Sequence, residues 1–255
     1  MRNVLSLSVA TCLALGLAGR AAAQEAPRAV LEKAIQASGG AEKLGKFTIS
    51  RSKFKGTGEF EGVRANLTGE VLVQLPRQMK LDLQVEVQGQ NVTLLYVVNG
   101  AKGWIQMLGQ TTEIKGHELE EQKESLHAEY VQMLVPLLRD KSFTLAPLGD
   151  LKVNGRDAVG IQVAQRGHKD VNLYFDKATW LLAKVERRIV EENGNQEATE
   201  GTYYSDYRKV DGVQVPMKLQ VYHDDKKILE GEVTEFQFLD RVEEGEFAAP
   251  GGGEK

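Results

Sequence analysis

The residues that could carry acid–base, metal or nucleophilic chemistry are scattered along this chain. Its four histidines do not pair at the short spacings that place two imidazoles on one face of an element; they are His117, His127, His168 and His223. The sequence contains no nucleophile elbow, no phosphate-binding loop and no Gly-x-Gly-x-x-Gly motif after a strand. It therefore predicts no catalytic residue, no metal site and no cofactor. The histidines are interpreted as solvated polar residues near element ends, with a zinc site assembled by the tertiary fold as the alternative.

Two acidic runs are the remaining candidates for acid–base chemistry. They are Glu118-Leu119-Glu120-Glu121 and Glu191-Glu192. Catalytic carboxylates need a partly desolvated pocket that separates their pKa values, whereas carboxylates on a polar helix face or in a turn are hydrated. We interpret both runs as solvated surface.

Aromatic residues and methionines suggest a different kind of chemistry, the binding of an apolar ligand. Rings and flexible thioethers suit a lipid-like molecule, and ordinary core packing is the alternative interpretation. Together with the apolar sides of the elements described below, they form a predicted ligand-binding set. This set comprises Leu83, Val85, Tyr96, Trp104, Met107, Leu126, Tyr130, Met133, Leu134 and Leu137.

Most of the chain after Phe47 has the alternation of antiparallel strands. From residue 80 to residue 88, leucine and valine alternate with charged or amide residues, which indicates a strand with one buried and one wet face. Short turns such as Asn99-Gly100 and Asp211-Gly212 indicate that each strand pairs with its neighbour in the sequence. Roughly ten such strands predict a mainly β fold built on a single, strongly curved antiparallel sheet, a half-open barrel.

Two helices interrupt this pattern. Ala29 to Ala37 reads as a short amphipathic helix that ends at Gly39-Gly40. Gly116 to Arg139 has an apolar stripe opposite a charged face, and Pro136 is expected to kink or end this helix near Val135. Because a curved sheet of this size has a concave face wider than its own side chains can fill, we expect this helix to cover it as a lid. An apolar cavity then remains beneath the lid if the two do not collapse together.

The first 23 residues have the features of a secretory signal. Arg2 is followed by an apolar run from Val4 to Leu17 and by Ala21-Ala22-Ala23, a cleavage site of the Ala-x-Ala type. The apolar run is too short for a membrane anchor, and Cys12 lies inside it rather than at its end, which argues against a lipoprotein signal. The sequence thus predicts export to the periplasm, cleavage near Ala23 and no transmembrane segment in the mature chain.

The rest of the chain shows no linker or shift of composition. We expect one domain over residues 24–247 and a disordered tail over residues 248–255, where Pro250 precedes three glycines. The chain has 255 residues with 42% hydrophobic content, which excludes wholesale disorder. Its 32 basic and 36 acidic side chains leave a formal charge of −4, so nucleic acid is not an expected partner.

Two segments in the second half of the chain resemble a known family. Leu173-Tyr174-Phe175-Asp176, followed by Thr179 to Lys184, is one segment, and Tyr204 to Pro216 is the other. Together they resemble the periplasmic outer-membrane lipoprotein-sorting proteins of the LolA/LppX-like superfamily. This resemblance implies a half-open barrel around a helical lid with a lipophilic interior. It also implies an arginine inside the barrel that hydrogen-bonds to the lid; Arg51 and Arg64 lie in suitable early strands, and no motif fixes either.

These observations predict a non-enzymatic periplasmic binding or carrier protein. Its ligand would be a lipid or an acylated lipoprotein held between the curved sheet and the helical lid, and a membrane protein of the envelope is a further candidate partner. A protein-interaction or envelope-sensing module without a lipid ligand is the alternative, and it predicts a filled barrel. A hydrolase with a fold-assembled site is the third hypothesis, and it requires catalytic groups that converge on the cavity.

Overall fold

A computed structural model describes residues 25–60, 62–190 and 196–251 of the chain. The first six strands are β1 (Ile49–Phe60), β2 (Val63–Gln74), β3 (Gln78–Val87), β4 (Gln90–Asn99), β5 (Lys102–Met107) and β6 (Gln110–Ile114). The later strands are β7 (Phe143–Val153), β8 (Arg156–Gln165), β9 (Val171–Asp176), β10 (Leu182–Val190), β11 (Glu197–Val210), β12 (Val213–His223) and β13 (Lys226–Phe238). The helices are α1 (Pro27–Ser38), α2 (Ala41–Leu44), α3 (Gly116–Gln132) and α4 (Val135–Arg139).

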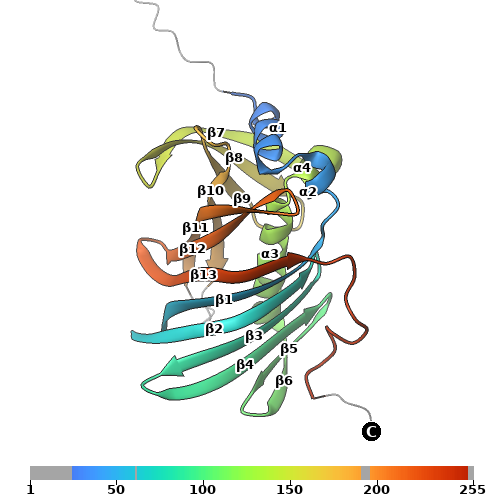
Figure 1. Ribbon diagram of the computed structural model, residues 1–255, viewed down its shortest axis with the longest axis vertical. Helices are drawn as coiled ribbons and strands as arrows, with labels where there is room; N and C mark the ends of the chain where they lie inside the picture. The colour runs from blue at the N-terminus through green and yellow to red at the C-terminus, as the bar shows by residue number, and fades with distance from the viewer. Residues whose placement is uncertain (1–24, 61, 191–195, 252–255) are drawn as a thin grey trace, which may run out of the picture.

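All thirteen strands of the described residues form one antiparallel sheet (Figure 1). Their order is β6-β5-β4-β3-β2-β1-β13-β12-β11-β10-β9-β8-β7. Two meanders, β1 to β6 and β7 to β13, thus join where the first and last strands pair, and β6 and β7 are the two edges. The prediction of a single, mainly β antiparallel sheet is confirmed, with three more strands than the roughly ten expected from the alternation.

The hairpin turns follow from local chemistry. Gln88-Gly89, Leu108-Gly109 and Asp211-Gly212 place two successive residues at positive φ, between 48° and 84°. This is the geometry of type I′ turns, whose twist matches that of the strands they join. Glycine takes the second position because it adopts positive φ without steric strain.

The long helix predicted at 116–139 is divided in two. The first part, α3, ends at Gln132, and Leu134 then has a φ of 60° before α4 begins at Val135. Pro136 lies in the first turn of α4, where its missing N–H breaks no helical hydrogen bond. The predicted break near Val135 is therefore confirmed, and its position shifts by a residue or two toward the N-terminus.

Helix α3 lies against what we call the inner face of the sheet, and it contacts both meanders through β4, β9 and β10 (Figure 1). Near its start, Leu119 and Leu126 pack with Val98 and Ile114 of β4 and β6. Near its end, Val131 joins a larger core that includes the buried side of α1 and the inward residues of β8 and β9. The regularly spaced apolar residues of α1 and α3 are buried in these two cores, so both helices pack firmly against the sheet.

The opposite, outer face carries the C-terminal segment. After β13, Phe247 packs with Ile49, Leu72 and Val97. Glu246 forms ion pairs with Arg51 at 3.0 Å and Lys80 at 2.8 Å.

Residues 248–251, expected to be disordered, continue along this face, because the Thr111 hydroxyl donates to the Pro250 carbonyl over 2.9 Å. Residues 252–255 lie outside the described residues. So do residues 1–24, and with them the predicted signal peptide and the predicted cleavage site. None of the helices within the described ranges is both long enough and apolar enough to cross a membrane.

Candidate functional site

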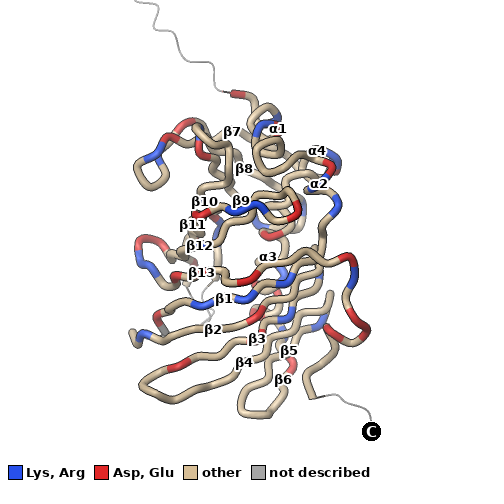
Figure 2. The backbone as a smooth tube through the Cα atoms, in the orientation of Figure 1, with Lys and Arg blue, Asp and Glu red and all other residues tan. Residues whose placement is uncertain are grey.

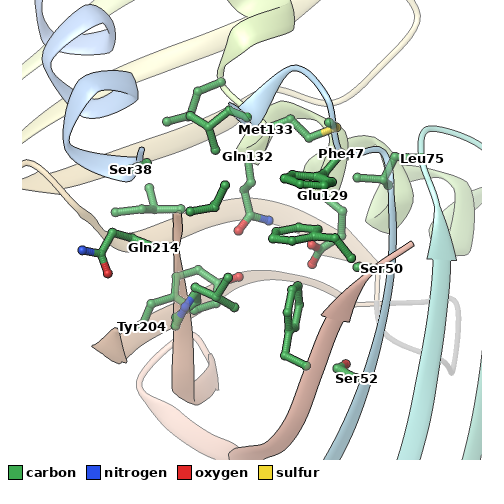
Figure 3. A pocket seen from close by; sticks show the side chains of 18 of the residues that line it. Ser38, Phe47, Ser50, Ser52, Leu75, Glu129, Gln132, Met133, Tyr204 and Gln214 are labelled. Carbon is green, nitrogen blue, oxygen red and sulfur yellow. The ribbon is translucent and has the colours of Figure 1, made fainter. Parts of the chain in front are cut away.

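A cavity of about 320 Å³ lies where the end of α3 faces the junction of the two meanders (Figure 3). The junction is formed by β1, β12 and β13, which are neighbours in the sheet although more than 150 residues separate β1 from β12 in the sequence. Helix α2, the segment that leads into β1, and residues of β10 and β11 contribute further parts of the wall. The apolar lining comprises Leu44, Phe47, Ile49, Leu75, Met133, Leu134, Leu182, Val213, Val215, Pro216, Leu219, Val233, Phe236 and Phe238.

Three phenylalanines form one wall of this cavity. The rings of Phe47 and Phe238 stack with centroids 4.2 Å apart, and Phe236 meets Phe238 edge-on at 4.9 Å. Offset-stacked and edge-on pairs are favourable arrangements that hold the rings in place. The cavity thus has a preformed apolar surface of the kind that binds hydrocarbon.

Helix α3 and strand β11 contribute four of the polar lining residues. Figure 3 shows the side chains of Glu129 and Gln132 pointing into the cavity, and the Tyr204 ring lies on its other side. Burial raises the pKa of the Glu129 carboxyl, an effect that the nearby Arg187 charge opposes. Glu129 is exposed, but its exposed surface opens into the cavity, so the burial that raises the pKa comes from the protein around the cavity. The Tyr207 hydroxyl is occupied, since it donates to the Leu182 carbonyl over 2.6 Å.

Behind Glu129 lies an arginine that joins the sheet to the helix. Arg187 of β10 is 10% exposed, and its Nε donates to Glu200 Oε1 of β11 over 2.9 Å. Its Nη2 donates to Ser125 Oγ of α3 over 2.9 Å, and its Nη1 lies 3.8 Å from Glu121 Oε2. Glu129 and Arg187 also line a second, smaller cavity of about 160 Å³.

Arg187 of β10 hydrogen-bonds to α3 from the inner face, whereas the resemblance pointed to the early strands. Arg51 lies on the outer face with Glu70 and Glu246, and Arg64 donates to Thr57 at an exposed site. The alternation of residues in the sequence did indicate that Arg187 faces inward, although the resemblance directed attention to the early strands. Alternation in β10 puts it between Val185 and Ile189, two buried residues of the same face.

The acidic face of α3 is less hydrated than the sequence suggested. Glu118 and Glu120 are exposed, but the side chains of Glu121 and Glu124 are only 16% and 14% exposed. Glu121 pairs with the Lys169 ammonium, and Glu124 accepts from the Lys169 backbone N–H over 2.9 Å. Helical spacing explains why the four carboxylates differ in exposure. Residues 121 and 124 are three positions apart, so they share the side of α3 that faces β9 and β10. The expectation of a solvated run at residues 118–121 was wrong for Glu121, which together with Glu124 holds the helix to the sheet.

His127 was also predicted to be solvated, and the structure places it in the interior. Its ring is buried and stacks on His168 with centroids 3.8 Å apart, while His168 Nδ1 lies 3.0 Å from Glu124 Oε1. Burial, reinforced by the His168 charge, lowers the pKa of His127 to about 4. Within residues 25–60, 62–190 and 196–251, no group of three His, Cys, Asp or Glu side chains could hold a metal ion.

The predicted ligand-binding residues fall in several places. Met133 and Leu134 line the cavity. Leu126 is in the core beside β4, Leu137 is in the core with α1, and Tyr130 packs against the latter. The remaining predicted residues belong to the first meander.

Within that meander, Leu83 and Val85 lie together on the inner face of β3, away from the lining of the cavity. Tyr96 of β4 is opposite Leu81 of β3, on the same face. Trp104 lies on the outer face in contact with the cluster around Phe247, because alternation in β5 turns it away from α3. Met107 is 48% exposed at the end of β5. Whether any of these residues contacts a ligand stays a prediction.

The cavity residues that sequence reasoning missed come from segments far apart in the chain. Phe47, Phe236 and Phe238 meet only because β1 pairs with β13. No local pattern reports such a pairing. The sequence did not single out Glu129, because a glutamate on a helix with many charged residues is normally interpreted as a surface residue.

No model of a known protein family matches this chain, and no curated protein sequence matches it either. Its fold is nevertheless shared by solved bacterial structures. A DUF1329 family protein from Desulfovibrio piger is 10% identical with a TM-score of 0.56, over 87% of this chain and 96% of its own. An outer membrane lipoprotein-sorting protein domain from Vibrio parahaemolyticus is 14% identical with a TM-score of 0.52, over 86% and 95%. A LolA superfamily protein from Nitrosomonas europaea is 10% identical with a TM-score of 0.52, over 86% and 96%.

At these identities the likeness concerns the fold. The chain has the LolA-like fold that its segments around Leu173 and Tyr204 resemble, so the fold expected from the resemblance is confirmed.

Proposed function

We propose that this chain is a non-enzymatic binding or carrier protein for a lipophilic ligand, the acyl chain of a lipid or of an acylated lipoprotein. The observation that carries the proposal is the cavity between α3 and the sheet, whose walls are mainly apolar. The fold supports it, because one structure that shares the fold is described as an outer membrane lipoprotein-sorting domain. The proposal places the protein in the periplasm as one domain that starts near residue 24, with an envelope membrane protein as a further partner.

The size of the cavity suits part of an acyl chain. Ligand pockets begin at about 300 Å³, so this cavity lies at the small end of the range. Some six to ten buried methylenes would contribute roughly 5–8 kcal/mol before the costs of association. The net affinity is then on the micromolar scale, which suits a carrier that must release its ligand.

Helix α3 is the lid of the proposal. Its middle is held by polar contacts to Arg187 and Lys169, while Leu119 and Val131 are buried near its two ends. Detaching the whole helix would expose both apolar ends to water, so we infer that opening is confined to its last turn and to Leu134. There the chain already leaves helical geometry, and Met133 and Leu134 border the cavity.

Titration with a fluorescent fatty acid tests the proposal. Met133→Trp places a large ring at the cavity wall and is expected to weaken binding at least about tenfold, a loss of about 1.4 kcal/mol. Leu108→Trp is the control, because the same new ring at a residue that is 81% exposed and outside the predicted ligand-binding set should leave binding unchanged. Thermal unfolding of each variant establishes that it is folded.

Native mass spectrometry of the protein from a periplasmic extract gives an independent readout, since a bound acyl species adds mass. A stable wild-type protein that never takes up the probe would reject the proposal in favour of an interaction module. Equal binding by both tryptophan variants would place the ligand elsewhere.

A further inference from the structure

The charges around the cavity are one-sided. Among the described residues that line it, Glu129 alone carries a carboxylate, ammonium, guanidinium or imidazole group. The other polar lining groups are hydroxyls and amides, and they comprise Ser38, Thr48, Ser50, Ser52, Gln132, Tyr204, Tyr207 and Gln214. An acyl chain that enters this cavity with a polar end therefore meets one acidic group and no basic one among these residues.

The positive charge that acts on Glu129 lies outside the larger cavity and is partly engaged within the protein. Arg187 lies behind Glu129, outside the lining of the larger cavity, and its guanidinium donates to Glu200 and Ser125. It also lies beside Glu121, so two carboxylates share its charge. Its Nη1 is buried and has no hydrogen-bond partner among the described residues, but Arg187 lines the smaller cavity and not the larger one, so an anionic head in the larger cavity would not meet it among the lining residues. Charged regions elsewhere on the chain are mixed, with blue and red segments interspersed along the strands and turns (Figure 2).

Glu129, in contrast, is directed at the space a ligand would fill. Its side chain points into the cavity in Figure 3 and keeps accessible surface there. Burial raises the pKa of this carboxyl, although the Arg187 charge and a hydrogen bond with Gln132 offset part of that effect. A cationic group at hydrogen-bond distance would offset the part that remains.

We propose that the cavity selects amphiphiles whose polar end is a protonated amine, with Glu129 as the group that binds it. This inference rests on the proposed function, because it assumes that a hydrocarbon chain occupies the apolar wall. A carboxylate head is disfavoured, since it would lie against Glu129 without an available basic partner. An uncharged hydroxyl head is intermediate, because it can donate one neutral hydrogen bond.

Three probes of equal chain length separate these cases, namely dodecylamine, 1-dodecanol and dodecanoate. Each is titrated as a competitor of a neutral fluorescent probe at pH 7.5, below its critical micelle concentration. We expect the wild-type protein to bind the amine at least about tenfold more tightly than dodecanoate, as charge-assisted hydrogen bonds typically provide. Glu129→Gln should reduce this preference to less than about threefold while it leaves the affinity for 1-dodecanol unchanged.

Glu120→Gln is the matched control, because Glu120 is exposed on the same helix and the change in net charge is the same. It should keep the full preference for the amine. A preference that survives in Glu129→Gln would show general attraction to an acidic protein and would overturn the inference. Glu129→Asp keeps a carboxylate and should retain part of the preference, which separates loss of charge from loss of folding.

The two proposals fail in different ways. If the wild-type protein binds dodecanoate as tightly as the amine, the selection by Glu129 is wrong while the lipophilic cavity stands. If none of the three probes competes, the cavity does not take hydrocarbon chains, and the proposed function fails with the inference.

Discussion

Arg187 and Arg188 are adjacent in the sequence and offer a matched test of what holds α3 to the sheet. They point to opposite faces of β10, and their surroundings differ accordingly. Arg187 is 10% exposed and contacts Glu200 and Ser125, whereas Arg188 is 64% exposed and pairs with Glu197 on the outer face. We predict that Arg187→Met destabilises the protein strongly and that Arg188→Met has almost no effect.

The magnitudes follow from what each substitution leaves behind. Removing Arg187 leaves Glu200 as a largely buried carboxylate, and uncompensated buried charges cost about 3–5 kcal/mol. His223 Nε2 lies 3.5 Å from Glu200 Oε2 and offsets part of this loss, so we expect about 2–4 kcal/mol. The exposed pair of Arg188 contributes about 0–1 kcal/mol. Methionine retains most of the apolar stem in both variants.

Urea unfolding gives the stability difference, and native-state hydrogen exchange shows where it acts. The α3 amides should lose protection in Arg187→Met, because the helix loses its bond through Ser125. Ser125→Ala provides the second arm of a double-mutant cycle, and a coupling energy near zero would mean that this hydrogen bond contributes nothing. Equal destabilisation by the two arginine substitutions would refute the reasoning, because the buried and the exposed arginine would then contribute equally to stability.

Two further predictions concern His127 and the C-terminal segment. The pKa of His127 is lowered to about 4 in the folded protein, whereas an unfolded histidine takes up a proton near 6.5. The unfolded state therefore binds more protons between these values, and the free energy of unfolding should fall by about 2 kcal/mol from pH 7 to pH 5. His127→Phe should remove this part of the pH dependence of stability. A urea midpoint that changes between pH 7 and pH 5 in this variant as much as in wild type would contradict the prediction. Phe247→Ala should cost about 3 kcal/mol, because the ring is buried among Ile49, Leu72 and Val97. Leu108→Ala, at a residue 81% exposed, is the control and should change the thermal midpoint little; equal shifts would mean that the segment is not packed.

The route by which α3 is fixed bears on how a carrier of this fold could release its ligand. Its polar contacts run to the second meander, through Arg187, Lys169 and His168. Its first apolar contacts run to the first meander, through Leu119 and Leu126. A relative movement of the two meanders would therefore strain the helix at one end or the other. The strand pair β1 and β13, which joins them, borders the cavity.

Local sequence determined most of the elements of this protein. Alternation in residues 80–88 fixed a strand and its inner face, and β3 has Leu83 and Val85 on that face. The helical stripe after Gly116 fixed α3, and Pro136 marked its interruption. These features rest on the backbone conformations and burial of residues close together in the chain, so a sequence pattern reports them directly. The overall fold was predicted from the resemblance of the segments around Leu173 and Tyr204 to a known family.

Only the tertiary structure decided which inward residues share a site. Strand β1 could have remained an edge, but it pairs with β13, and this register brings Phe47 next to Phe238. Other long-range contacts put Arg187 against Ser125, and the placement of α3 directs Glu129 into the cavity. Alternation predicts the face of the sheet on which a strand residue lies. It does not predict which residues of that face meet, because this depends on sheet register and on the placement of α3. Both are set by contacts between residues far apart in the chain, which no local spacing records.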